Sequence, residues 1–100
     1  MKLDHIAIQV SSIADSVEWY TNSLDAEIIY EDKTWAMLNV KGTQLALTLP
    51  EQHPAHIAFR VNNLEDIPCT DIRVHRDKTK YAYVEDPDGN IIEYIYYPCG

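Results

Sequence analysis

The chain contains the stretch HIAIQVSSIAD at residues 5–15 and the similar stretch HIAFRVNNLED at residues 56–66. Five of the eleven positions are identical at an offset of 51 residues, and four more pair near-equivalent side chains such as Ile with Phe or Ser with Asn. Self-similarity at a fixed period dictates architecture, so the sequence predicts two copies of one supersecondary unit. The repeat also places His5 and His56 at matched positions. A twofold arrangement of the copies would bring two imidazoles toward one point.

Length and charge narrow the class of protein. One hundred residues make about one domain, and 46% hydrophobic residues supply a core. The net charge is −8, from 16 acidic against 8 basic residues, and the sequence has no basic run. This balance argues against nucleic acid and anionic membrane surfaces as partners, although a single Arg can still bind a small anionic ligand.

The N-terminus and the cysteines point to the cytoplasm. Asp4 and His5 interrupt any apolar stretch after Met1, so we expect neither a signal peptide nor a transmembrane helix. Cys69 and Cys99 form no CxxC motif, which favours two free thiols in a reducing compartment.

The first copy, residues 1–50, predicts one strand, one helix and three further strands. Residues 2–10 alternate between aliphatic side chains on one face and small or polar ones on the other, with period two. Ser12 is the expected N-cap of a helix, whose apolar residues recur at spacings of three and four until Asp25. Strands are expected at 27–32, 35–40 and 43–49, with a turn at Lys41-Gly42.

The second copy, residues 55–98, repeats this pattern with a truncated helix. A strand at 55–61 is followed by about one helical turn at 63–67, which Pro68 stops. Strands are then expected at 70–76, 80–85 and 90–97, with a tight turn at 86–89. The fold class is therefore α+β, built from two βαβββ modules.

The truncated helix leaves the aliphatic face of the strand at 55–61 without an evident cover. Ile57, Phe59 and Val61 share that face. Exposed apolar patches of this kind mark interaction surfaces, so we predict a homodimer with twofold symmetry. The alternative is that the C-terminal tail, residues 96–100, folds over the gap.

Four segments carry a family resemblance: LDHIAIQV at 3–10, SVEWYTNSL at 16–24, HIAFRV at 56–61 and EDPDGNIIEYI at 85–95. With them the chain resembles the vicinal oxygen chelate superfamily, which groups glyoxalases, bleomycin-resistance proteins and extradiol dioxygenases. The resemblance implies a single glyoxalase-like domain over residues 1–100. Its two modules would form a curved, eight-stranded mixed sheet around a cavity that often holds a metal.

The same resemblance implies metal ligands at His5, His56 and Glu93, and these residue types suit Fe²⁺, Mn²⁺, Ni²⁺ or Zn²⁺. The family's fourth ligand position corresponds to Ala46, because Gly42 aligns with Gly89. Alanine cannot coordinate a metal, which argues against glyoxalase I activity. The remaining three ligands resemble the two-His-one-carboxylate triad of ring-cleaving dioxygenases, whose open positions bind substrate oxygens and O₂.

Several further residues are candidates for the reaction or for the substrate. Tyr83 lies ten residues before Glu93, where such dioxygenases carry a catalytic Tyr. These dioxygenases also use a further catalytic His, and the candidates for it in this sequence are His75 and His53. Arg60 and Gln9 each lie four residues beyond a repeat His and are predicted to bind a substrate carboxylate or carbonyl. The alternative is that both side chains lie in water at the end of the sheet.

Two functions remain open at this point. The first is a small metal-dependent enzyme that acts on a compound with adjacent oxygen atoms, using the metal as a Lewis acid in a lyase, isomerase or dioxygenase reaction. The second is a metal-free protein of the bleomycin-resistance type that binds or sequesters a small molecule. The acidic balance, the Tyr-rich strands and Ala46 favour the second, and the His-His-Glu set favours the first.

Overall fold

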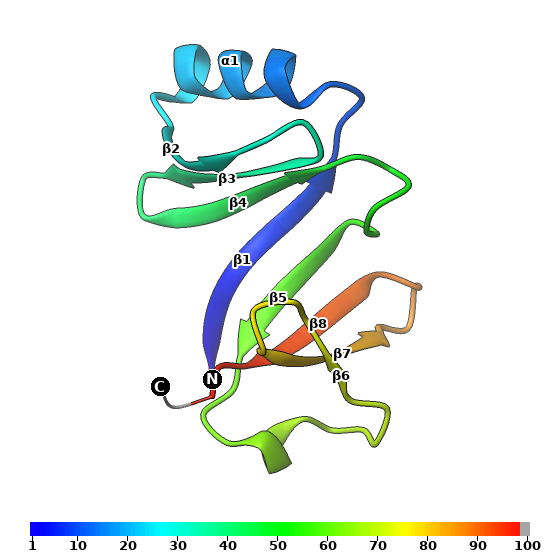
Figure 1. The fold of residues 1–100 in the computed structure, drawn as a ribbon. Helices are drawn as coiled ribbons and strands as arrows, with labels where there is room; N and C mark the ends of the chain where they lie inside the picture. The colour runs from blue at the N-terminus through cyan, green and yellow to red at the C-terminus, as the bar shows by residue number, and fades with distance from the viewer. Residues whose placement is uncertain (99–100) are drawn as a thin grey trace. The chain divides into compact units, whose positions relative to one another are not determined.

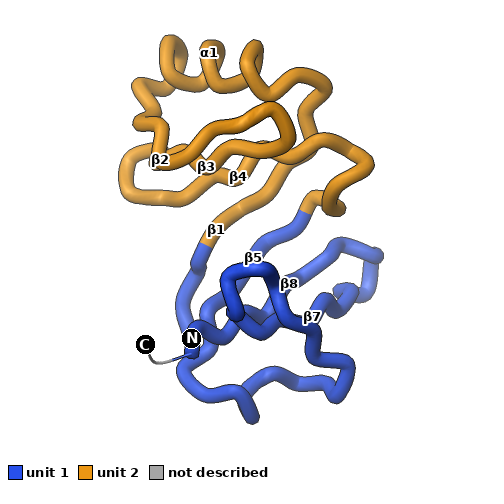
Figure 2. Tube along the Cα trace, in the orientation of Figure 1, with its two compact units in different colours: residues 1–4, 56–100 blue, residues 5–55 orange. Residues whose placement is uncertain are grey.

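The computed structural model describes residues 1–98 and confirms the α+β class (Figure 1). It contains eight strands in the order β2-β3-β4-β1-β5-β8-β7-β6, a mixed arrangement of parallel and antiparallel pairs. The chain divides into two compact units, shown in Figure 2. Unit one comprises Met1–Asp4 and the chain from His56 onward, and unit two comprises His5–Ala55. Strand β1, Lys2–Gln9, contributes residues to both.

Unit two is built around its helix α1, Ile13–Leu24. The Ser12 hydroxyl accepts a hydrogen bond from the Asp15 N–H at 3.2 Å, which confirms the predicted N-cap. The buried helix residues Ile13 and Val17 pack with Ala36, Leu38 and Leu47. Strands β2 (Glu27–Glu31), β3 (Trp35–Val40) and β4 (Thr43–Thr48) are antiparallel neighbours, and β1 pairs parallel with β4.

Unit one repeats the strand plan with a much shorter helical segment. Strand β5, His56–Arg60, is parallel to β8, Ile91–Tyr96, which is antiparallel to β7, Lys80–Glu85. The truncated helix is a three-residue 3₁₀ turn at Leu64–Asp66, as predicted. Strand β6 is only Arg73–Val74, shorter than the strand expected at 70–76.

The face expected to lack cover is partly covered within unit one. Val61 is only 3% exposed and forms a core cluster with Ile67 and Ala82, so the expectation that Val61 is uncovered is wrong. The segment that replaces the helix contributes three partly buried residues to this cluster: Leu64, Cys69 and Ile72. Ile57 remains 40% exposed. The thiol of Cys69 is free, whereas Cys99 lies outside the described residues, as does the end of the proposed C-terminal cover.

The pairing registers show that the sequence repeat is also a structural repeat. In unit two Ala7 pairs with Ala46, and in unit one the equivalent Ala58 pairs with Glu93. The turns before β4 and β8 each contain a glycine in the left-handed region, Gly42 at φ +94° and Gly89 at φ +85°. Ala46 is therefore the structural counterpart of Glu93, as the sequence predicted.

Across residues 1–98, no helix has the length and apolar character needed to cross a membrane.

Candidate metal centre

Glu93 is the most deeply buried charged residue among those the structure describes, at 1% exposure in the middle of β8. Its neighbours across the sheet are Ala58 on β5 and Tyr83 on β7. A buried carboxylate is costly unless polar partners satisfy it. The equivalent position in the first module is the apolar Ala46, so the strand pairing itself does not require a carboxylate there.

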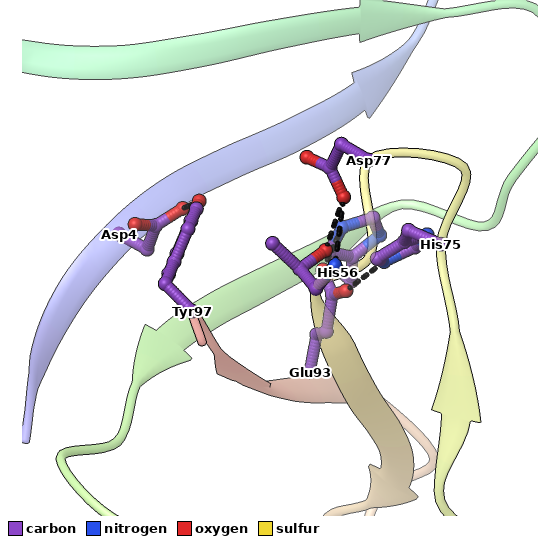
Figure 3. A network of polar contacts seen from close by, with 7 residues as sticks. Asp4, His56, His75, Asp77, Glu93 and Tyr97 are labelled. Atoms are coloured by element: carbon purple, nitrogen blue, oxygen red, sulfur yellow. Dashed lines mark hydrogen bonds and ion pairs between the residues drawn. The ribbon is translucent and has the colours of Figure 1, made fainter. Parts of the chain in front are cut away.

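Two imidazoles satisfy the two oxygens of this carboxylate (Figure 3). The Nε2 atom of His56 lies 3.1 Å from Oε1 of Glu93, and the Nε2 atom of His75 lies 2.9 Å from Oε2. His56 begins β5 and is 8% exposed, whereas His75 follows β6 and is half-buried. Unit one therefore holds a His-Glu-His arrangement around a buried carboxylate.

The turn between β6 and β7 fixes His75. Its N–H donates to the carbonyl of Thr79 at 2.9 Å, and its own carbonyl accepts from the N–H of Lys78 at 3.0 Å. Asp77 accepts hydrogen bonds from the N–H and the hydroxyl of Thr79, and the hydroxyl bond is the main cause of the lowered pKa of Asp77. The His75 ring stacks on Tyr81 with centroids 3.6 Å apart and planes 10° apart.

Tyr83 lies beside the same carboxylate. Its half-buried ring is 5.4 Å from the ring of His56. Burial first, and then the negative charge of Glu93, raise the pKa of Tyr83 well above its ordinary value. The phenol therefore stays protonated at neutral pH and can donate a hydrogen bond.

One pair of donor atoms in unit one has a spacing compatible with a shared divalent metal. Two donor atoms that share a metal at about 2.0–2.2 Å lie roughly 3.0–3.5 Å apart in octahedral or tetrahedral sites. The separation of 3.1 Å between Nε2 of His56 and Oε1 of Glu93 falls in that range. An imidazole nitrogen and a carboxylate oxygen are also ligands that Fe²⁺, Mn²⁺, Ni²⁺ and Zn²⁺ accept.

Arg60 takes part in a separate cluster of unit one. Its guanidinium carbon lies 4.2 Å from the centre of the Tyr97 ring, a cation–π contact at the exposed end of β5. The Tyr97 hydroxyl donates to Oδ2 of Asp4 at 3.0 Å (Figure 3). Burial and the charge of Asp4 raise the pKa of Tyr97.

The remaining predicted site residues belong to unit two. His5 is half-buried on β1. The side-chain amide of Gln9 donates to the carbonyls of His53 at 2.9 Å and Pro50 at 3.4 Å, so it tethers the linker after β4. The predicted substrate contacts of Gln9 and Arg60 stay predictions. His53 itself is exposed in that linker.

The contact between His75 and Glu93 was the main feature that sequence reasoning missed. His75 was considered only as a dioxygenase-type catalytic His. A usable signal was the Asp77-Lys78-Thr79 stretch, because an Asp side chain commonly accepts a hydrogen bond from the backbone two residues on, in an Asx turn. Such a turn leads directly into β7, which pairs with β8.

Comparison with known proteins shows which family this chain matches. The model of the Glyoxalase/Bleomycin resistance protein/Dioxygenase superfamily matches residues 2–68. A metallothiol transferase FosB from Staphylococcus haemolyticus is 38% identical over 112 aligned residues, covering 91% of this chain and 80% of the relative. Biphenyl-2,3-diol 1,2-dioxygenase 3 from Rhodococcus globerulus is 28% identical, and the match covers 92% of this chain and 61% of that enzyme.

Solved structures agree on the fold. A methylmalonyl-CoA epimerase from Mycobacterium tuberculosis superposes with a TM-score of 0.78 at 20% identity, covering 98% of this chain and 89% of the other. The hypothetical protein BH1468 from Bacillus halodurans C-125 gives a TM-score of 0.80 at 20% identity, covering 99% and 96%. At this identity the likeness shows shared architecture alone.

Proposed function

Because the chain belongs to the glyoxalase/bleomycin resistance protein/dioxygenase superfamily, we propose that it is a metal-dependent enzyme acting on a small substrate with adjacent oxygen atoms. The observation that carries the proposal is the buried carboxylate of Glu93, whose two oxygens lie at the Nε2 atoms of His56 and His75. Buried titratable groups gathered in this way are a common mark of a functional site.

His5, His56 and Glu93 are the proposed metal ligands. Two histidines and a glutamate are residue types that could hold such an ion. Support for His56 and Glu93 comes from their 3.1 Å contact inside unit one. Support for His5 comes from the repeat, because it occupies in the first copy the position that His56 occupies in the second.

A divalent metal bound there would act as a Lewis acid toward the substrate's oxygen atoms. The protein's own side chains supply the surroundings. Tyr83, kept neutral by burial and by Glu93, offers a phenol O–H that can donate to a substrate oxygen. Arg60 supplies a cation at the end of β5 that can bind an anionic group of the substrate.

Transfer of a thiol compound is the reaction class that the relatives favour. The FosB proteins that match this chain at 38% identity are metallothiol transferases, whereas the biphenyl-2,3-diol 1,2-dioxygenase matches at 28%. We therefore propose metal-dependent thiol transfer to an oxygen-bearing small molecule, ahead of ring cleavage. Ala46, which leaves three proposed protein ligands, is compatible with both reactions.

A second candidate is metal-free binding of a small molecule. It is favoured by the observation that no buried side-chain nitrogen or oxygen in residues 1–98 lacks a hydrogen-bond partner. Each oxygen of Glu93 thus has an imidazole partner in the absence of a metal. Measuring ligand binding before and after treatment with a chelator separates the two functions. A metal-free binding protein would keep its ligand affinity after the treatment, whereas a metal-dependent enzyme would lose it.

We also propose that the chain acts as a homodimer. The support is the apolar surface that stays exposed in each unit, including Ile57 in unit one at 40% and Ile29 in unit two at 54%. Light scattering at micromolar concentration should give twice the mass of the chain. A stable monomer at that concentration would contradict the dimer without affecting the metal site.

The experiment for the enzymatic proposal follows the loss of free thiol. Chelator-treated protein is reloaded with Mn²⁺, Fe²⁺, Ni²⁺ or Zn²⁺ and given a low-molecular-weight thiol and a panel of small oxygen-bearing electrophiles. Thiol consumption should need the metal and should disappear in Glu93→Gln, while the matched control Glu85→Gln, an exposed position at the end of β7, keeps it. Cleavage of a catechol with O₂ in place of thiol transfer would establish the dioxygenase reaction instead.

A further inference from the structure

We propose that His75 is a positioning residue that holds Glu93 as a one-oxygen metal ligand, and this inference rests on the metal site proposed above. His75 is not one of the residues proposed to bind the metal. It contacts the far oxygen of the carboxylate, Oε2, at 2.9 Å, while Oε1 lies on the side of His56 at 3.1 Å. Each imidazole thus contacts a different oxygen of the carboxylate (Figure 3).

The contact of His75 with one oxygen bears on how many oxygens of Glu93 can bind a metal. A free carboxylate can bind a metal through one oxygen or through both. The hydrogen bond from His75 uses one acceptor site of Oε2 and holds that oxygen on the side of His75, whereas Oε1 lies beside Nε2 of His56. A monodentate carboxylate leaves one more coordination position for substrate oxygens than a bidentate one.

His75 is itself held in place by the fold. Its ring stacks on Tyr81 with centroids 3.6 Å apart and nearly parallel planes, and its backbone forms two hydrogen bonds that close the β6–β7 turn. Thr79, which accepts one of these bonds, is 3% exposed. A rigid partner of this kind fixes the orientation of a ligating carboxylate, as hydrogen-bonded partners of metal ligands commonly do.

The positions of the hydrogens separate the roles of the two histidines. An ionised carboxylate only accepts hydrogen bonds, so an imidazole that contacts it through Nε2 donates the hydrogen of that atom. His56 must give up that hydrogen to coordinate a metal through Nε2. His75 is expected to keep its hydrogen, because it continues to donate to Oε2.

The first arm of the test measures metal affinity by calorimetric titration of chelator-treated protein with Zn²⁺. His75→Phe keeps a ring to stack on Tyr81 and removes the donor, whereas His75→Gln removes the ring and keeps a donor. The affinity of His75→Phe should fall 10- to 100-fold, the range found for lost partners of metal ligands, and His75→Gln should recover part of it. Arg76→Gln, the exposed neighbour, is the matched control and should bind as the wild type does.

The second arm records the ring nitrogens of His56 and His75 by NMR, without metal and with Zn²⁺. We expect His75 to show an Nε2–H in both states and His56 to show it only without metal. Circular dichroism confirms that each variant is folded. Two results would each overturn the role of His75 and leave the proposed metal site standing. One is a Zn²⁺ affinity of His75→Phe within twofold of the wild type, and the other is loss of the His75 Nε2 hydrogen on Zn²⁺ binding. A wild-type protein that binds no metal would overturn the proposed metal site as well.

Discussion

Tyr83 on β7 lies directly opposite Glu93 on β8, in the register that Met37 and Ala46 occupy in the other copy of the repeat. The pairing places a phenol next to a buried carboxylate, and burial and the Glu93 charge raise the pKa of Tyr83. A hydrogen-bond donor that stays neutral is therefore built into the same strand pair as the proposed metal ligand.

The first prediction concerns high pH. Tyrosine in an unfolded chain ionises near pH 10, whereas the pKa values of Tyr83 and Tyr97 are raised in the folded protein. Their contribution to stability is thus fully present below about pH 10 and is lost as the pH rises toward the folded pKa values. Urea unfolding should show the free energy of unfolding falling above that pH, and falling less in the Tyr83→Phe/Tyr97→Phe double variant. An equal fall in both proteins would contradict this assignment.

The second prediction concerns the hydrogen bond from Tyr97, which follows β8, to Asp4 on β1. Removing the Tyr97 hydroxyl in Tyr97→Phe should cost about 0.5–1.5 kcal/mol of unfolding free energy, the usual net value of one hydrogen bond, because the hydrogen bond from that hydroxyl to Asp4 is lost. A double-mutant cycle with Asp4→Ala, measured by urea unfolding, isolates the pair. Fully additive effects of the two substitutions would show that the bond contributes nothing.

The third prediction concerns the segment that replaces the second helix. Ile67 is 5% exposed in the cluster with Val61 and Ala82, so Ile67→Ala should destabilise the protein by about 2–5 kcal/mol. Val74 is 58% exposed, and Val74→Ala should change stability by less than about 0.5 kcal/mol. Equal effects in thermal or urea unfolding would mean that the segment does not form part of the core.

Much of the fold could be predicted from the sequence because the repeat and the local signals agree. The helix begins after the Ser12 cap, and the two turn glycines mark equivalent hairpins. These features depend on neighbouring residues, so they are readable in one sequence. The equivalence of Ala46 and Glu93 followed from the repeat and is confirmed by the pairing registers.

The rest depends on contacts between residues distant in the chain. His75 and Glu93 are 18 residues apart, and their contact needs both the β6–β7 turn and the register of β7 with β8. The cover of Val61 likewise depends on how an irregular segment packs, which no periodic pattern encodes. Strand β6 is short because the turn that holds His75 begins directly after Val74.

The central claim is that Glu93 is a metal ligand, and elemental mass spectrometry tests it most directly. The protein is purified without an affinity tag or added metal, beside Glu93→Ala. The account predicts close to one equivalent of iron, manganese, nickel or zinc per chain in the wild type, lost in the variant. A wild-type protein that is free of metal and fails to bind any of the four on reconstitution would contradict it, and His5 and His56 would then be structural residues.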